Sequence, residues 1–295
     1  KGQVEGRIVA ESGQLLTETD FAVQASDLLV DVMGHRILGL GEVTIGPSGK
    51  VPGWLDLKVR FTHPSVTHVG DQDPLLVGET LRLGLTGSGD LTGNADPTDD
   101  RRSLSFHIDD LLAPDLSLFE HYLPAKWPIR LIGGEGRVNG TALIAASALD
   151  IGVSLKSEDA ELGAAEYRFT SDLEAALNVS NPSTGSSDTM IGGSYIKLSD
   201  ARLSDRDDAS VEPWEASFTI NDGGLSLLPD EAKGHDDGVR DLLQVIGETD
   251  SKALLNNLRG FVDFDSRVSS LAWIGVFLDD SYGTALRGRG GLGGR

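Results

Sequence analysis

Apolar and polar residues alternate along most of this chain. The segment 55–61 (LDLKVRF) places four apolar side chains on one side of an extended chain and three charged ones on the other. The same alternation recurs in segments 81–85, 104–108, 151–155, 167–172, 195–198 and 218–220. Strands with one apolar face are typical of antiparallel sheets, whereas parallel sheets need continuous apolar strands separated by long amphipathic helices. We therefore expect a mostly β, antiparallel fold.

Helical spacing occurs in only a few short segments. Apolar residues within 116–123 follow Pro114-Asp115, which predicts one or two helical turns. Three further short helices are expected near the C-terminus, in segments 236–247, 251–260 and 268–278. We accordingly predict a β-repeat region over residues 1–230 and a mixed helix and strand region over residues 231–295 that continues the repeat pattern.

A glycine motif of the form G-x-G-x-(aliphatic)-x-G repeats along the chain. It occurs at 87–93, 134–140 and 288–294, with a weaker copy at 39–45. The first three copies in chain order start 48 and 47 residues apart, which predicts an array of repeats of roughly 48 residues. Glycine at alternate positions leaves one side of a strand bare and lets it bend. We expect a curved, extended sheet shaped as a groove or a sandwich.

Composition and charge exclude several classes of protein. The chain has 25 basic and 46 acidic side chains, a formal net charge of −21, and no cysteine. A surface this acidic repels nucleic acid, and without cysteine there is neither a disulfide, a thiolate metal site nor a cysteine nucleophile. The apolar stretches are too short for a transmembrane segment. Because the chain starts without a signal segment and stops within a glycine motif, we expect a fragment of a longer protein.

Candidate catalytic and metal-binding patterns are weak. The glycines of the motif alternate with strand-like aliphatic residues and no helix follows them, so they do not predict a phosphate-binding loop. The six histidines, at 35, 63, 68, 107, 121 and 235, are scattered, which favours surface positions over zinc ligation. The acidic clusters 96–100, 205–208 and 231–237 lack the spacing of a calcium loop. No two carboxylates are singled out for acid–base chemistry, so we predict no catalytic residue, no metal site and no cofactor.

The apolar sides of the strands are the candidate functional feature. A closed core is the simpler interpretation, since a strand with one apolar face must bury it somewhere. A curved sheet could instead leave this face partly open as a trough for acyl chains. The residues assigned to such a trough are Leu55, Leu57, Val59, Phe61, Leu81, Leu83, Leu85, Leu104, Phe106 and Ile108.

Two stretches of the chain carry a family resemblance. Segment 115–124 (DLSLFEHYLP), followed by 129–140 (IRLIGGEGRVNG) and alternating strands, resembles the AsmA-like proteins that include the translocation and assembly module family (TamB). The tail, with segments 258–264, 271–278 and 286–293, is similar to a further turn of the same pattern. The resemblance implies a long periplasmic β-sheet rolled into an apolar groove and anchored to the inner membrane by an N-terminal helix. It also implies roles in phospholipid movement and outer-membrane biogenesis.

The resulting hypothesis is a non-enzymatic, periplasmic segment of an AsmA-like protein that shields phospholipid acyl chains and contacts other envelope proteins. This sequence lacks an anchor helix, which fits an internal segment. The first alternative is a structural or adhesive β-repeat module whose acidic loops bind a protein or calcium. The second is a carbohydrate-active enzyme, against which the aromatic content of 6% argues because sugars stack on aromatic rings.

Overall fold

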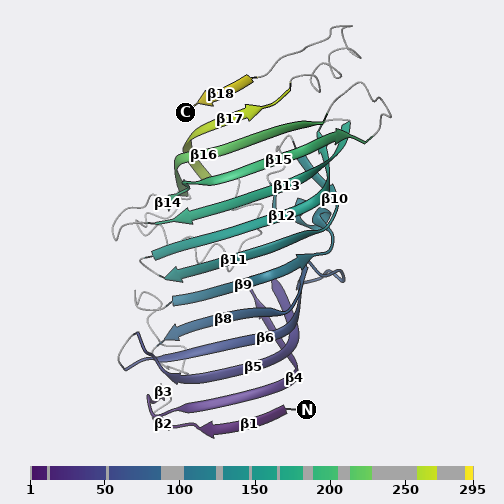
Figure 1. Ribbon diagram of the computed structural model, residues 1–295. Coiled ribbons are helices and arrows are strands. Elements are labelled where there is room, and N and C mark those ends of the chain that lie inside the picture. Colours follow the sequence, from purple (N-terminus) through teal and green to yellow (C-terminus); the bar gives the residue numbers. More distant parts are fainter. Residues whose placement is uncertain are drawn as a thin grey trace.

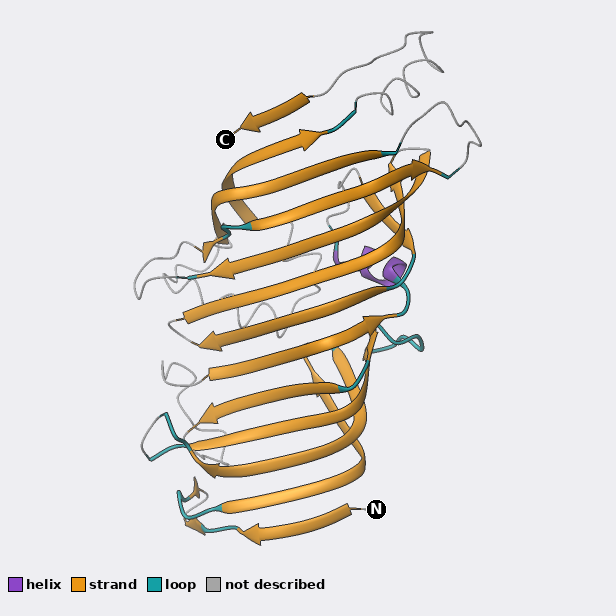
Figure 2. Cartoon of the chain, in the orientation of Figure 1, coloured by secondary structure: helices purple, strands orange, loops and turns teal. Residues whose placement is uncertain are grey.

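The computed structural model shows one long, twisted sheet (Figures 1 and 2). It describes residues 2–11, 14–50, 53–87, 103–123, 129–145, 148–164, 167–181, 189–204, 213–227, 258–270 and 290–294. In these residues sixteen strands form a single sheet, in which every pairing is antiparallel, and β2 and β3 form a separate hairpin. The predicted class, a mostly β fold with a curved antiparallel sheet, is confirmed.

The strands follow one another across the sheet nearly in chain order. Their bounds are β1 Gly2–Arg7, β2 Ala10–Glu11, β3 Gln14–Leu15, β4 Asp20–Val32, β5 His35–Pro47, β6 Leu55–His68, β7 Leu76–Val77, β8 Thr80–Gly87, β9 Ser103–Ala113, β10 Ile129–Gly133, β11 Gly136–Ala145, β12 Ala148–Ala164, β13 Tyr167–Ser180, β14 Thr189–Met190, β15 Ser194–Leu203, β16 Trp214–Leu227, β17 Leu258–Val268 and β18 Gly290–Gly294. All seven segments with predicted alternation lie within strands.

A line of β-bulges crosses the sheet and bends it. Four strand residues adopt left-handed backbone conformations, with φ between 48° and 58°: His63, Asp110, Asp159 and Asp200. The register shifts beside each of them, because two residues on one strand face a single residue on its neighbour. Aspartate and histidine tolerate this conformation better than most residues. We call this line the crease; in Figure 1 the strands turn back along it at the right.

Two of the three intervals between these bulges match the predicted repeat. Positions 63, 110, 159 and 200 lie 47, 49 and 41 residues apart, on β6, β9, β12 and β15, which are every second strand of the sheet. One repeat of roughly 48 residues is therefore a pair of antiparallel strands of which one carries a bulge. Gly134 of the glycine motif also lies on the crease with φ +96°, and a Cβ there would lie 3.0 Å from Ala160 Cα.

The crease divides the sheet into two parts that pack against each other. The longer strand segments form the main wall, and the shorter segments beyond the bulges form the flap, made of residues 28–32, 35–38, 64–68, 76–77, 111–113, 129–133, 160–164, 167–171 and 201–203. One apolar cluster contains Phe61, Leu81 and Leu173 from the main wall together with Leu111 and Leu162 from the flap. The sheet is thus folded over its own apolar side, which we call the inner face.

One short helix fastens the flap. Among the described residues the only helix is η1, the 3-10 helix Leu116–Tyr122, where one or two turns were predicted. The Asp115 carboxylate caps it by accepting a hydrogen bond from the Ser117 backbone N–H at 2.8 Å. Glu120 Oε2 accepts a hydrogen bond from the Leu131 N–H of β10 at 2.9 Å. The helix is therefore tied to a flap strand through its side chains.

The C-terminal predictions are only partly covered by the described residues. Leu258 to Gly260 begin strand β17, so the helix expected over 251–260 is wrong at its end, where backbone pairing to β16 decides the conformation. The helix expected over 236–247 lies outside the described residues, as does most of the one over 268–278. The described parts of 231–295, β17 and β18, join the same sheet. No described helix has the length and apolar character needed to cross a membrane.

Candidate functional site

The ten predicted trough residues lie together on the inner face. The register aligns nine of them in three cross-strand rows of three: Phe61, Leu81 and Ile108; Val59, Leu83 and Phe106; Leu57, Leu85 and Leu104. Leu55 continues the same side of β6. These rows form because β6, β8 and β9 pair in register over whole segments of alternating sequence, so that every second residue points the same way.

Exposure on this face is low beside the crease and uneven farther along the strands. Phe61 and Leu81, in the row nearest the crease, are 0% and 4% exposed, whereas Leu85, in the farthest row, is 45% exposed. Leu55, Val59 and Leu83 are also buried, and Leu57, Leu104, Phe106 and Ile108 are half-buried. The inner face is therefore a closed core beside the flap, and farther along the strands it contains both buried residues, such as Leu55, and exposed ones, such as Leu85.

The rows extend well beyond the ten predicted residues. The farthest row continues from Ile45 on β5 through Leu57, Leu85 and Leu104 to Ile144 on β11 and Leu149 on β12. Five inter-strand spacings of ~4.8 Å make this row about 24 Å long. The row nearest the crease continues through Val153 to Leu177 on β13, which is 48% exposed.

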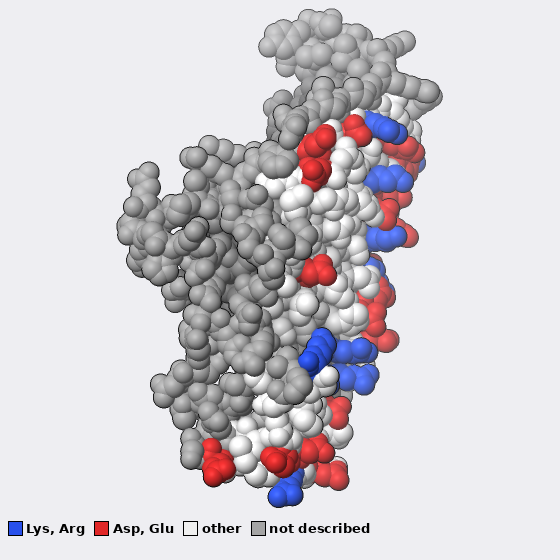
Figure 3. All heavy atoms as spheres, turned by 90° about the vertical axis from the view of Figure 1, so that its left-hand side faces the viewer, with Lys and Arg blue, Asp and Glu red and all other residues white. Residues whose placement is uncertain are grey.

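Charged side chains are confined to the opposite side of the main wall, the outer face. Along β6, β8 and β9 the residues between the apolar positions include Lys58, Arg60, Arg82 and His107. Figure 3 shows most of the described Lys, Arg, Asp and Glu side chains along its right-hand margin, which is the side of the molecule facing the viewer in Figure 1. The sheet thus separates an apolar side from a charged one.

A polar network on the outer face keeps one carboxylate ionised. Glu174 Oε1 lies 3.2 Å from Lys156 Nζ and accepts a hydrogen bond from the Tyr195 hydroxyl at 3.0 Å. These two donors lower the pKa of Glu174, and the same bond raises the pKa of Tyr195. The three side chains come from β12, β13 and β15, so the network joins neighbouring strands on the side away from the apolar rows.

Three of the six histidines meet at the end of the flap. His35 and His68 are directly opposite each other on β5 and β6, with ring centroids 5.7 Å apart, and His121 of η1 lies 5.7 Å from His68. His35 Nε2 is hydrogen bonded to the Tyr122 hydroxyl at 2.7 Å. Burial lowers the pKa of His35 and raises that of Tyr122. Histidine spacing along the sequence could not show this cluster, because strand register creates it.

In the described ranges no group of three or more His, Asp and Glu side chains is arranged to hold a metal ion. The acidic clusters 205–208 and 231–237, considered for calcium, lie outside the described residues, as does 96–100. The histidine cluster is therefore treated as a structural contact between η1 and the flap.

Comparison with known proteins adds no further assignment. No family model matches the chain, and no curated protein or solved structure shows significant similarity to it. The resemblance to AsmA-like proteins stays a prediction.

Proposed function

We propose that this protein shields phospholipid acyl chains along the open part of its inner face, as a non-enzymatic component of a bacterial envelope. The observation that carries the proposal is the combination of uninterrupted apolar rows with large exposed side chains inside them. Leu85 and Leu177 keep 45% and 48% of their surface exposed although their neighbours across the strands are apolar. A water-exposed apolar surface of this kind is typical of a binding site.

The dimensions of the face support an acyl chain as its ligand. One leaflet of a bilayer contributes about half of a hydrocarbon core of ~30 Å, so an extended acyl chain needs roughly 15 Å. The apolar row from Ile45 to Leu149 spans about 24 Å, with Ile144 and Leu149 buried at one end of it. Binding would gain on the order of 25 cal/mol for each Å² of apolar surface removed from water, without selecting a headgroup. The resemblance to AsmA-like proteins adds a periplasmic location and contacts with other envelope proteins to the proposal.

Native mass spectrometry with lipid extraction tests the proposal on protein purified without detergent. We expect co-purified phospholipid in the unaltered protein and its loss in Leu85→Asp and Leu177→Asp, because each change puts a charge on the open part of the inner face. Thr141→Asp is the matched control, since Thr141 is exposed on the outer face of β11. Circular dichroism checks that each variant keeps its strands.

A lipid-free and cooperatively folded protein would favour the second candidate, a structural or adhesive module. The buried side chains beside the flap, including Phe61, Leu81 and Leu111, support that candidate. Loss of lipid in Thr141→Asp as great as in Leu85→Asp would also contradict the proposal, because it would show that lipid does not distinguish the two faces.

A further inference from the structure

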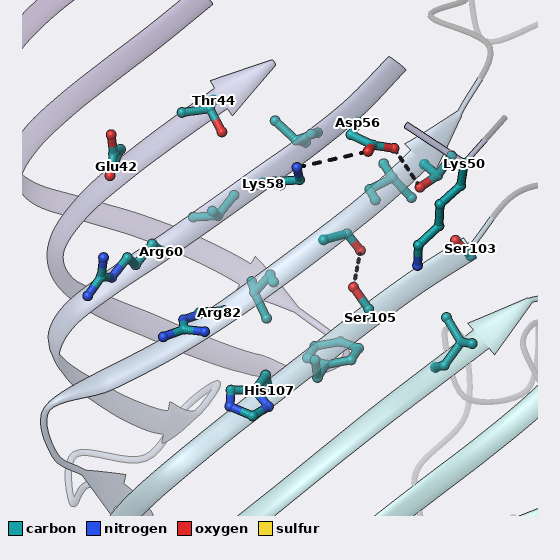
Figure 4. A pocket seen from close by; sticks show the side chains of 18 residues that line it. Glu42, Thr44, Lys50, Asp56, Lys58, Arg60, Arg82, Ser103, Ser105 and His107 are labelled. Carbon is teal, nitrogen blue, oxygen red and sulfur yellow. Dashed lines mark hydrogen bonds and ion pairs between the residues drawn. The ribbon is translucent and has the colours of Figure 1, made fainter. Parts of the chain in front are cut away.

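The outer face of the main wall contains a hollow with a basic lining. The hollow has a volume of about 500 Å³ and lies over β5, β6, β8 and β9 (Figure 4). Its charged lining residues are four cations and two carboxylates: Lys50, Lys58, Arg60, Arg82, Glu42 and Asp56. A local excess of positive charge is unexpected in a chain with a formal net charge of −21.

Strand register forces two arginines into direct opposition. Arg60 on β6 is paired with Arg82 on β8, and Arg82 is paired with His107 on β9. Directly opposite residues have Cβ atoms about 4.5–5.5 Å apart, and like charges at that distance are destabilising. Both arginine side chains are exposed and point to the same side, as Figure 4 shows. Folding alone therefore gives no reason for this pair.

The nearby carboxylates do not neutralise the arginines. Glu42 is paired with Arg60 in the register, yet neither arginine forms an ion pair with any described residue. Asp56 is already engaged, since it accepts a hydrogen bond from Thr86 at 2.9 Å and lies 4.0 Å from Lys58 Nζ. Two guanidinium groups are thus left with donors directed to solvent at the edge of the hollow.

The middle of the hollow is kept open by a glycine. Gly84 lies opposite Lys58 and Ser105 on the two neighbouring strands. A Cβ at Gly84 would lie 2.5 Å from Ser105 Oγ, so any side chain at this position would enter the space between the cations. Ser105 and Ser103 add hydroxyl groups to the lining. The result is a recess with positive charge at its edge, lined by small polar groups together with apolar residues of the same strands.

We infer that this hollow binds a phosphate group, held by Arg60 and Arg82 with Lys58 as an additional charge. The guanidinium group donates paired hydrogen bonds that match the oxygens of a phosphate, and two arginines on adjacent strands can share one such group. A bound dianion would also remove the repulsion between the arginines. The phosphate would belong to a soluble phosphorylated molecule or to a lipid headgroup, and the experiment below separates these sources.

This site is independent of the proposed acyl-chain face. The cations of the hollow lie on the outer face, on the side of the strands opposite the side chains of the apolar rows. The lining of the hollow also includes five residues of those rows: Leu57, Val59, Leu83, Leu85 and Phe106. One phospholipid molecule cannot place its headgroup in the hollow and its acyl chains on the inner face, because the sheet separates them. Failure of either proposal would leave the other standing.

Isothermal titration calorimetry with inorganic pyrophosphate at low salt is the first test. We expect saturable binding that weakens about tenfold or more in Arg82→Gln and further in Arg60→Gln/Arg82→Gln, the loss expected for hydrogen bonds between charged groups. Arg137→Gln is the matched control, because Arg137 is an exposed arginine already paired with Asp110 at 3.1 Å. Without ligand, the double variant should melt at the same temperature as the unaltered protein or higher, since like charges have been removed.

A flotation assay with phosphatidic acid vesicles, and with phosphatidylcholine vesicles as the control, identifies the source of the phosphate. Pyrophosphate binding that depends on the arginine pair supports a soluble ligand. Binding to phosphatidic acid vesicles alone, with the same dependence, supports a headgroup. The inference is overturned if neither probe binds, or if Arg137→Gln weakens binding as much as Arg82→Gln, because general charge attraction would then explain it.

Discussion

Two leucines on the same side of β8 differ in how much of their surface is exposed, so substituting each of them tests how far the folded sheet is closed. Leu81 is 4% exposed and packs in the apolar cluster beside the flap, whereas Leu85, four residues along the strand, is 45% exposed. Both have apolar residues directly opposite them on β6 and β9. Because residue type, strand and face are the same, Leu81→Ala and Leu85→Ala differ mainly in burial.

The expected energies follow from that difference. Replacing a fully buried leucine with alanine costs roughly 2–5 kcal/mol, which includes the cavity that is left. We expect about 3 kcal/mol for Leu81→Ala. Leu85 keeps nearly half of its surface in water and its removal leaves no enclosed cavity, so we expect about 1 kcal/mol for Leu85→Ala. The difference between the two variants is therefore ~2 kcal/mol.

Urea unfolding followed by circular dichroism measures both free energies, with unchanged m-values as the check that unfolding remains comparable. Any bound ligand must be removed first, because it would add to the stability of the folded state. Equal losses of about 3 kcal/mol in the two variants would refute the reasoning, since they would show that the inner face is as well packed at Leu85 as at Leu81.

Three further predictions concern the crease and the flap. Gly134→Ala should lower the free energy of unfolding by about 2 kcal/mol, because the φ of +96° at Gly134 and the nearby Ala160 backbone disfavour a side chain. Gly46 has open space around it, so Gly46→Ala should change the free energy of unfolding by less than ~0.5 kcal/mol. Similar losses in the two variants would contradict the account of the crease. Asp115→Ala should cost about 1 kcal/mol by removing the cap of η1, which the same urea titration measures, and an unchanged midpoint would contradict it. Burial lowers the pKa of His35, so its stabilising contribution is complete above about pH 6.5 and is lost as the pH falls below that value. Thermal melting between pH 7.5 and 5.5 should therefore fall more steeply in the unaltered protein than in His35→Gln, and parallel curves would contradict this.

The strands and their apolar sides were predictable because alternation is a local signal. Each of the ten trough residues lies on the predicted face, since a strand directs every second side chain the same way. The degree of closure was not predictable. It depends on the flap packing over Phe61 and Leu81, which is a contact between residues distant in sequence.

The crease has a signal in the sequence, which is an interruption of the two-residue alternation. Apolar positions are normally two residues apart in a strand, but they are three apart in the stretches 108–111 (IDDL) and 198–201 (LSDA). In both stretches an aspartate directly precedes the second apolar residue. This slip in the alternation is what a bulge with a left-handed aspartate requires, as at Asp110 and Asp200. The basic hollow, in contrast, arises from the pairing of Arg60 with Arg82, which depends on strand register and has no local signature.

The regular placement of bulges on alternate strands has a consequence for how such a protein changes in evolution. Each hairpin unit carries its own bend and contacts mainly the units on either side of it, so duplicating or deleting one unit alters the length of the molecule and leaves its cross-section the same. Stability should then be close to a sum of unit and neighbour contributions, as in other linear repeat architectures. A family built this way could vary widely in span while conserving the profile of its interior.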